Sequence, residues 1–207
     1  MAIGRSGAAV VAGVILGGFG AQNGVAAPAL PHGTYAAVGE RTSVPYGWVD
    51  FCNRYGAECD TQPLDPADID LTAAALADIE RVDREVNAAV TPETDMDHWG
   101  VVDRWDYPVD GKGDCEDYAL LKRRILMRQG YPRQALLITV VKDLDGEGHA
   151  ILTVKTNRGD FVLDNLNDRV MAWSDTGYKF VKRQSQADPN AWLSIGSPAG
   201  APQYTAK

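Results

Sequence analysis

The sequence predicts an α+β domain in which a helix that begins at a cysteine packs on an antiparallel sheet. Apolar residues recur at helical spacing in two segments, 68–90 and 114–130. The period then changes, and short β-branched runs at 135–141, 149–155 and 161–165 are separated by polar turns that contain glycine. Helices followed by strands that hairpin turns connect are typical of this fold class.

The first 27 residues have the composition of a secretory signal peptide. Arg5 precedes an apolar stretch at 8–16, and small residues continue through Ala27. The apolar stretch is shorter than the roughly 20 residues that a membrane-spanning helix needs. Removal of this segment would leave a domain of residues 28–207 with a net charge of 19 − 28 = −9. We therefore expect an exported protein that resides in the periplasm.

Residues 28–60 are rich in glycine, proline and aromatic residues, which predicts an irregular N-terminal wrap. Cys52 and Cys59 lie in this segment, in a polar stretch suited to a turn. In an oxidising compartment two such neighbours usually pair, whereas a zinc site would need two further ligands nearby. We predict a Cys52–Cys59 disulfide, which leaves Cys115 as an unpaired thiol.

The two predicted helices have recognisable ends. Pro92 closes the first, and the acidic stretch 94–107 is predicted to form a compact loop or short helical turns. Gly111-Lys112-Gly113 frees the backbone before the second helix, and Asp114 is placed to cap it. Residues 170–195 are expected to add one more strand.

Cys115 is a candidate nucleophile because a helix N-terminus lowers the pKa of a thiol. Asp114 and Glu116 flank it, and nearby carboxylates raise a thiol pKa. A cationic partner is then needed, and an imidazolium is the usual one. His149 opens a strand after a turn that contains glycine, and Asp164, near the end of the next strand, could fix the tautomer of His149.

Spacing alone leaves the strand register open. A four-residue turn at 155–158 would place His149 directly opposite Asp164. A turn at Arg158-Gly159 would instead place Thr153 opposite Asp164. A buried structural thiol and a strand histidine without a catalytic role are the alternative interpretation of the same residues.

Four segments carry a family pattern, in this order along the chain: Thr94–Trp105, Gly113–Ala119, Gly148–Leu152 and Val162–Leu166. Together they resemble the bacterial transglutaminase-like cysteine proteinases, whose best-known branch is the LapG-like periplasmic proteases that release adhesins. The resemblance implies a papain-like or transglutaminase-like domain. It also implies that Cys115 is the nucleophile, His149 the general base and Asp164 the residue that orients His149.

In the LapG branch the acids beside the cysteine are implicated in calcium binding, and they correspond to Asp114 and Glu116. A bound cation would offset the charge of two carboxylates that otherwise hinder the thiol. The alternative is that these acids cap the helix. The cysteine pair at 52 and 59 is not part of the LapG pattern, which points to a sister branch of the same family.

The expected function is that of an exported cysteine endopeptidase that cleaves a periplasmic or surface protein, an adhesin being one candidate. The alternatives are an acyltransferase or transglutaminase with the same triad, and a non-catalytic binding module. Calcium is the expected cofactor, with no organic cofactor. A membrane-protein regulator is implied by the resemblance, and a monomer is expected. Nucleic acid is excluded as the main partner, because the net charge is −8 and phosphate binding needs clustered basic residues.

Overall fold

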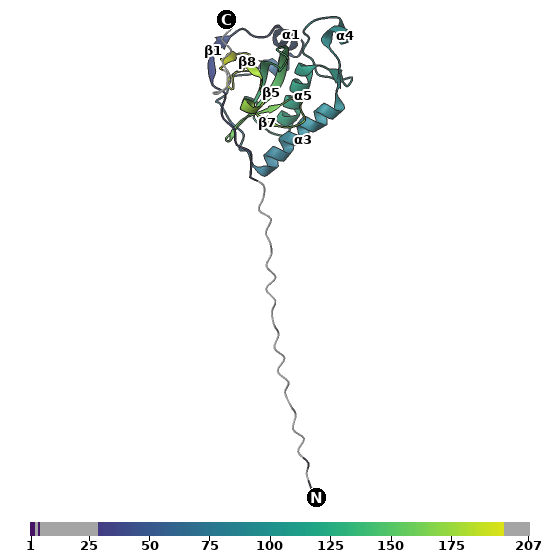
Figure 1. Cartoon of the computed structure of the whole chain (residues 1–207), viewed down its shortest axis with the longest axis vertical. Coiled ribbons are helices and arrows are strands. Elements are labelled where there is room, and N and C mark those ends of the chain that lie inside the picture. The colour runs from purple at the N-terminus through teal and green to yellow at the C-terminus, as the bar shows by residue number, and fades with distance from the viewer. Residues whose placement is uncertain (3, 5–28, 197–207) are drawn as a thin grey trace.

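A seven-stranded antiparallel sheet forms the centre of the fold (Figure 1). The computed structural model describes residues 29–196 together with Met1, Ala2 and Gly4, so most of the expected signal peptide lies outside the described residues. From one edge to the other the strands are β1 (Val38–Thr42), β9 (Trp192–Ile195), β8 (Lys179–Gln184), β4 (Leu136–Lys142), β5 (Gly148–Thr156), β6 (Gly159–Leu163) and β7 (Met171–Ala172).

Two long helices, α3 (Ala73–Ala89) and α5 (Cys115–Arg128), pack on each other, and α5 packs on β4 and β5 (Figure 1). The shorter elements are α1 (Tyr46–Arg54), α2 (Gly56–Cys59), α4 (Asp95–Trp99), the 3-10 helices η1 (Arg133–Ala135) and η2 (Trp173–Asp175), and a parallel pair formed by β2 (Thr91–Pro92) and β3 (Lys112–Gly113). The α+β class predicted from the sequence is confirmed.

Apolar residues fill both faces of the sheet, and the alternation along β5 shows how. Leu152 and Val154 belong to the main core between the sheet and the helices. Ile151 points to the other face, where it joins a smaller cluster with Trp173 and Phe180. Because successive side chains of a strand point to opposite faces, a central strand covered on both sides is apolar at nearly every position.

The first predicted helix begins later than its apolar spacing indicated. Thr72 caps α3 by accepting a hydrogen bond from the backbone N–H of Ala75. Ile69 is buried in an isolated parallel bridge with Thr156 instead of forming a helical turn. The expectation that the helix starts at residue 68 is therefore wrong, because a strand-like contact with the sheet buries the first apolar residue.

The N-terminal segment 28–60 is more regular than predicted. It contains β1, α1 and α2, and Trp48 and Phe51 lie on the buried side of α1, whereas Tyr46 is exposed. The Trp48 ring lies 6.2 Å from that of Trp105, and the Phe51 ring lies 5.5 Å from that of Tyr107. Cys52 and Cys59 are joined by the predicted disulfide bond, which is confirmed.

The C-terminal part adds three strands where one was expected. β8 pairs with β4, on the side of β4 away from β5, and β9 then pairs with both β8 and β1. Burial along β8 does not alternate regularly, and β7 has only two residues. These strands therefore lack the period-two pattern by which a strand is recognised in a sequence.

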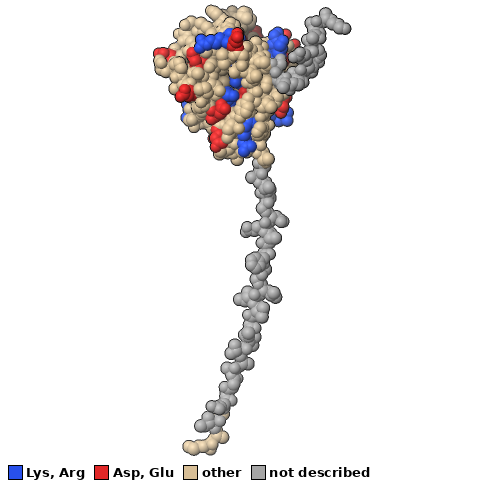
Figure 2. All heavy atoms as spheres, turned by 90° about the vertical axis from the view of Figure 1, so that its left-hand side faces the viewer, with Lys and Arg blue, Asp and Glu red and all other residues tan. Residues whose placement is uncertain are grey.

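Acidic and basic side chains are interspersed with uncharged residues over the face drawn in Figure 2. On α3, Arg81 forms exposed ion pairs with Asp78 and Glu85, at 2.9 Å and 3.1 Å. Such pairs contribute little to stability, because solvent screens them. Among the described residues, no helix combines the length and apolar character needed to cross a bilayer.

Candidate active site

Cys115 is the first residue of α5 and is half-buried. Its Sγ donates to Glu116 Oε2 at 3.0 Å and accepts the backbone N–H of Ala150 at 3.4 Å. The helix can begin here because Gly113 has no side chain: a Cβ at that position would lie 2.5 Å from Asp117 Oδ2. The start of α5 thus lies against the start of β5, next to His149.

His149 and Asp164 are brought together by a register that the sequence analysis did not consider. The turn between β5 and β6 consists of Asn157-Arg158, so Asp164, one residue beyond β6, falls opposite Ile151 in continued pairing. Ile151 is two residues from His149, so the two side chains form a diagonal pair on the same face. His149 Nε2 lies 2.8 Å from Asp164 Oδ1, and both residues are buried.

Three further groups hold Asp164. The hydroxyl of Tyr178 donates to Oδ2 at 2.6 Å, the backbone N–H of Leu166 donates to Oδ1 at 3.0 Å, and Asn87 Nδ2 donates to the main-chain oxygen at 2.9 Å. Burial opposes the charge on Asp164, but its hydrogen bonds, above all that from His149, keep its pKa below the usual range. Asp164 is therefore held as a carboxylate beside the imidazole.

Tyr178 and Asn87 were missed by the sequence analysis. Tyr178 immediately precedes β8, on the far side of β4 from β5, and Asn87 belongs to α3. No spacing rule links either residue to Asp164 along the chain, because only the folded sheet and helix packing bring them into contact.

Cys115 and His149 are neighbours without a direct hydrogen bond between Sγ and the imidazole in the described structure. His149 uses Nε2 for Asp164, which leaves Nδ1 as the ring nitrogen available to another partner. A cleft of about 480 Å³ opens at the thiol, and its lining includes Cys115, Asp114, Asn165 and residues 92–94. A substrate carbonyl could therefore approach the Cys115 sulfur through this cleft, next to Asn165.

Buried acids surround the start of α5. Asp95, Asp114 and Asp117 each place a carboxylate oxygen within 4.8 Å of those of the others, and Glu116 forms a second such group with Asp114 and Cys115. Among the described residues, none of these four acids forms an ion pair with a basic side chain. Buried charges without such partners are costly, so the cluster favours either protons or a cation.

The acids meet this cost in part by holding protons. Burial, followed by repulsion from Asp114, raises the pKa of Glu116 well above its usual value. Burial likewise raises the pKa of Asp95 to about 6 and that of Asp117 to about 8, against opposing hydrogen bonds from backbone N–H groups. The same surroundings act on the thiol: burial, and then the charge of Glu116, raise the pKa of Cys115 well above its ordinary value.

Capping does not explain Asp114. Asp114 is the N-cap residue of α5, as predicted, but its side chain makes no cap hydrogen bond to the helix. Oδ2 instead accepts the backbone N–H of Asp95 at 3.2 Å, and Oδ1 is buried without a hydrogen-bond partner. Carboxylate oxygens that converge without basic partners suit a hard divalent cation.

Asp95 and Asp117 extend the acid pair considered from the sequence. Asp117 lies three residues after Asp114, so helical spacing could have placed the two on one face. Asp95 belongs to α4, and only the packing of α4 beside the start of α5 brings it to the cluster.

A family model described as bacterial transglutaminase-like cysteine proteinase BTLCP matches residues 38–199. A comparison with curated proteins found no match.

Solved structures of LapG from Legionella pneumophila are similar to this chain. One shares 30% sequence identity, covers 56% of this chain and 67% of LapG, and has a TM-score of 0.49. Calcium-bound LapG shares 27% identity over 61% of this chain and 74% of LapG, with a TM-score of 0.50. The EGTA-treated form shares 28% identity over 59% and 72%, with a TM-score of 0.48.

Proposed function

Because the chain belongs to the bacterial transglutaminase-like cysteine proteinases, we propose that its peptidase reaction is carried out by Cys115, His149 and Asp164. Family membership makes the chain a cysteine peptidase of the transglutaminase-like class, with a protein as its substrate. The observation that supports this triad most directly is the buried His149–Asp164 hydrogen bond beside a strand residue, Ala150, whose N–H contacts the Cys115 sulfur.

The proposed reaction is acyl transfer to sulfur followed by hydrolysis. Cys115 gives its proton to His149 and attacks the carbonyl carbon of a peptide bond, forming a C–S bond. His149 passes that proton to the departing nitrogen as the C–N bond breaks. A water molecule, deprotonated by His149, then attacks the thioester, the C–S bond breaks and the proton returns to sulfur. Asp164 fixes the tautomer of His149 and stabilises its charged form without taking the proton.

We further propose that calcium occupies the acid cluster. The residues that would hold it are Asp95, Asp114 and Asp117, with Glu116 beside them, and Asp114 Oδ1 is buried without a hydrogen-bond partner. Calcium-bound LapG, at 27% identity, supports this choice of cation. A divalent ion there would supply positive charge next to a thiol that otherwise has acidic neighbours, which favours the thiolate.

The substrate and its location are part of the proposal. Residues 1–27 are proposed to be a signal peptide and 28–207 the peptidase domain, which acts as a monomer on a periplasmic or surface protein, an adhesin being one candidate. The Cys52–Cys59 disulfide supports an oxidising compartment. A membrane-protein regulator is proposed as its partner, and nucleic acid is not.

Comparative proteomics of secreted and surface proteins tests this function. A fragment produced by the wild-type strain should disappear in strains carrying Cys115→Ala or His149→Ala. The Asp164→Asn strain should still produce a small amount of this fragment. His32→Ala is the matched control, since His32 is exposed and lies in the segment before β1. Fragments that persist in the Cys115→Ala strain would contradict the proposal. Product masses with and without an added amine then separate hydrolysis from acyl transfer.

A further inference from the structure

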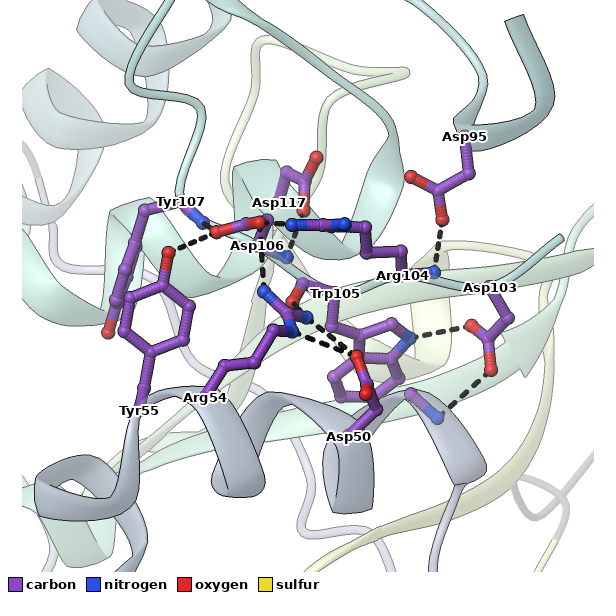
Figure 3. A network of polar contacts seen from close by, with 11 residues as sticks. Asp50, Arg54, Tyr55, Asp95, Asp103, Arg104, Trp105, Asp106, Tyr107 and Asp117 are labelled. Carbon is purple, nitrogen blue, oxygen red and sulfur yellow. Dashed lines mark hydrogen bonds and ion pairs between the residues drawn. The ribbon is translucent and has the colours of Figure 1, made fainter. Parts of the chain in front are cut away.

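Segment 103–107 runs between α1 and the acid cluster and contacts both (Figure 3). On the side of the cluster it uses its backbone. The N–H of Arg104 donates to Asp95 Oδ2, and the N–H of Asp106 donates to Asp117 Oδ1 at 2.6 Å. Each of these two carboxylates thus has one oxygen fixed by the segment.

On the side of α1 the segment is anchored through side chains. The Asp106 carboxylate accepts hydrogen bonds from Arg54 Nη1 at 2.8 Å, from the Tyr55 hydroxyl and from Arg104 Nε at 3.3 Å (Figure 3). Arg54 Nη2 also donates to the main-chain oxygen of Trp105 at 2.5 Å. The carboxylate of Asp106 is fully satisfied by these contacts, so its function toward the cluster is carried by its backbone N–H.

Arg54 and Tyr55 lie inside the loop that the disulfide closes. Cys52 is in the last turn of α1 and Cys59 ends α2, and the two Cα atoms are 5.5 Å apart. Tyr55 is the residue between the two helices, and buried Phe51, one turn before it, anchors α1 in the core. The disulfide therefore fixes the corner from which both side chains reach Asp106.

We propose that Arg54 and Tyr55 are positioning residues for the acid cluster, and that the Cys52–Cys59 disulfide holds them in place. Through Asp106 and the backbone of segment 103–107 they set where the carboxylates of Asp95 and Asp117 lie. This inference rests on the proposed calcium site. Groups that orient metal ligands without touching the metal commonly change metal affinity when they are lost.

Calorimetric titration of the full protein with calcium measures this directly. Arg54→Met removes two hydrogen bonds to segment 103–107 and one to Asp50, and calcium binding should weaken by roughly ten-fold. Tyr55→Phe removes a single hydroxyl and should weaken binding by less. The double variant Cys52→Ala, Cys59→Ala should also bind more weakly, and it introduces no new thiol.

Arg81→Met is the matched control, because it makes the same exchange at an arginine whose ion pairs lie on the exposed side of α3. Its calcium affinity should equal that of the wild type. Peptidase activity of the Arg54 variant should return at saturating calcium, which a general loss of folding would not allow. If Arg54→Met does not fold, the Tyr55→Phe titration decides.

Two results would overturn the inference. They differ in whether the proposed calcium site is refuted as well. Wild-type affinity in the folded Arg54, Tyr55 and disulfide-free variants would refute the positioning role and leave the calcium site standing. Absence of calcium binding by the wild type would remove the calcium site as well, while the triad would still stand or fall on the proteomic test.

Discussion

Replacing Tyr178 by phenylalanine removes one hydroxyl from a buried position and leaves Asp164 Oδ2 without its 2.6 Å donor. The ring itself keeps its edge-on contact with His149, at 5.8 Å between centroids. A hydrogen bond to a buried charged group contributes about 1.5–3 kcal/mol. Loss of this donor removes a hydrogen bond to the charged form of Asp164, so the pKa of Asp164 should rise in the variant.

Urea denaturation at neutral pH should show that the unfolding free energy of the variant is lower than that of the wild type by about 1.5–3 kcal/mol. Asp164 has a depressed pKa in the folded state, so its contribution is present above its unfolded pKa and is lost as pH falls through its folded pKa. The difference between wild type and variant should therefore shrink in acid. The titratable groups near Asp164 are His149, Asp168 and the Lys122–Asp83 pair.

Activity gives the second measurement. A less firmly held Asp164 orients His149 less well, so kcat should fall several-fold while KM stays near its wild-type value. Tyr131→Phe is the matched control, because its hydroxyl donates at 3.1 Å to Asp78, a carboxylate at the surface. Equal stability losses in the two variants, or an unchanged kcat in Tyr178→Phe, would refute the reasoning.

Three further predictions concern stability. Lys122→Met breaks the 2.7 Å buried pair with Asp83 and should cost about 3–5 kcal/mol in urea denaturation, and adding Asp83→Leu should recover most of it; an additive double variant would contradict this. Ile138→Ala, at a fully buried position of β4, should lower the unfolding free energy by about 2–5 kcal/mol in the same assay. A smaller loss would show that neighbouring side chains move in to fill the cavity. Because Asp95 and Asp117 have raised pKa values in the folded state, the metal-free protein should lose stability as pH rises from 5 to 8, and calcium should raise Tm more at pH 8 than at pH 6; a calcium effect independent of pH would count against the acid cluster as its site.

The periodic elements were predictable from the sequence because their signals are local. The apolar stripe of α3, the glycine-led start of α5 and the β-branched runs of β4, β5 and β6 all lie near their expected positions. The same is true of the Cys52–Cys59 pair, whose partners are seven residues apart. What failed depended on distant contacts, such as the bridge between Ile69 and Thr156 that delays α3.

The candidate site was only partly accessible from the sequence. Cys115, His149 and Asp164 could be named from the motifs, but the diagonal register between the last two depends on a turn at Asn157-Arg158 that no residue type enforces. Asp95 could not be found at all, because its role depends on how α4 packs beside α5. Strand register and the packing of short helices depend on tertiary contacts, which cannot be derived from local sequence patterns.

The acidic surroundings of Cys115 also bear on how long the enzyme survives before it acts. Oxidants and alkylating agents attack a thiolate far faster than a thiol. Burial and the charge of Glu116 raise the pKa of Cys115, so less of the one free thiol among the described residues is present as the thiolate that these reagents attack. Calcium bound at the acid cluster, as proposed, would lower the pKa of the thiol and remove this protection, and loss of the ion would restore it.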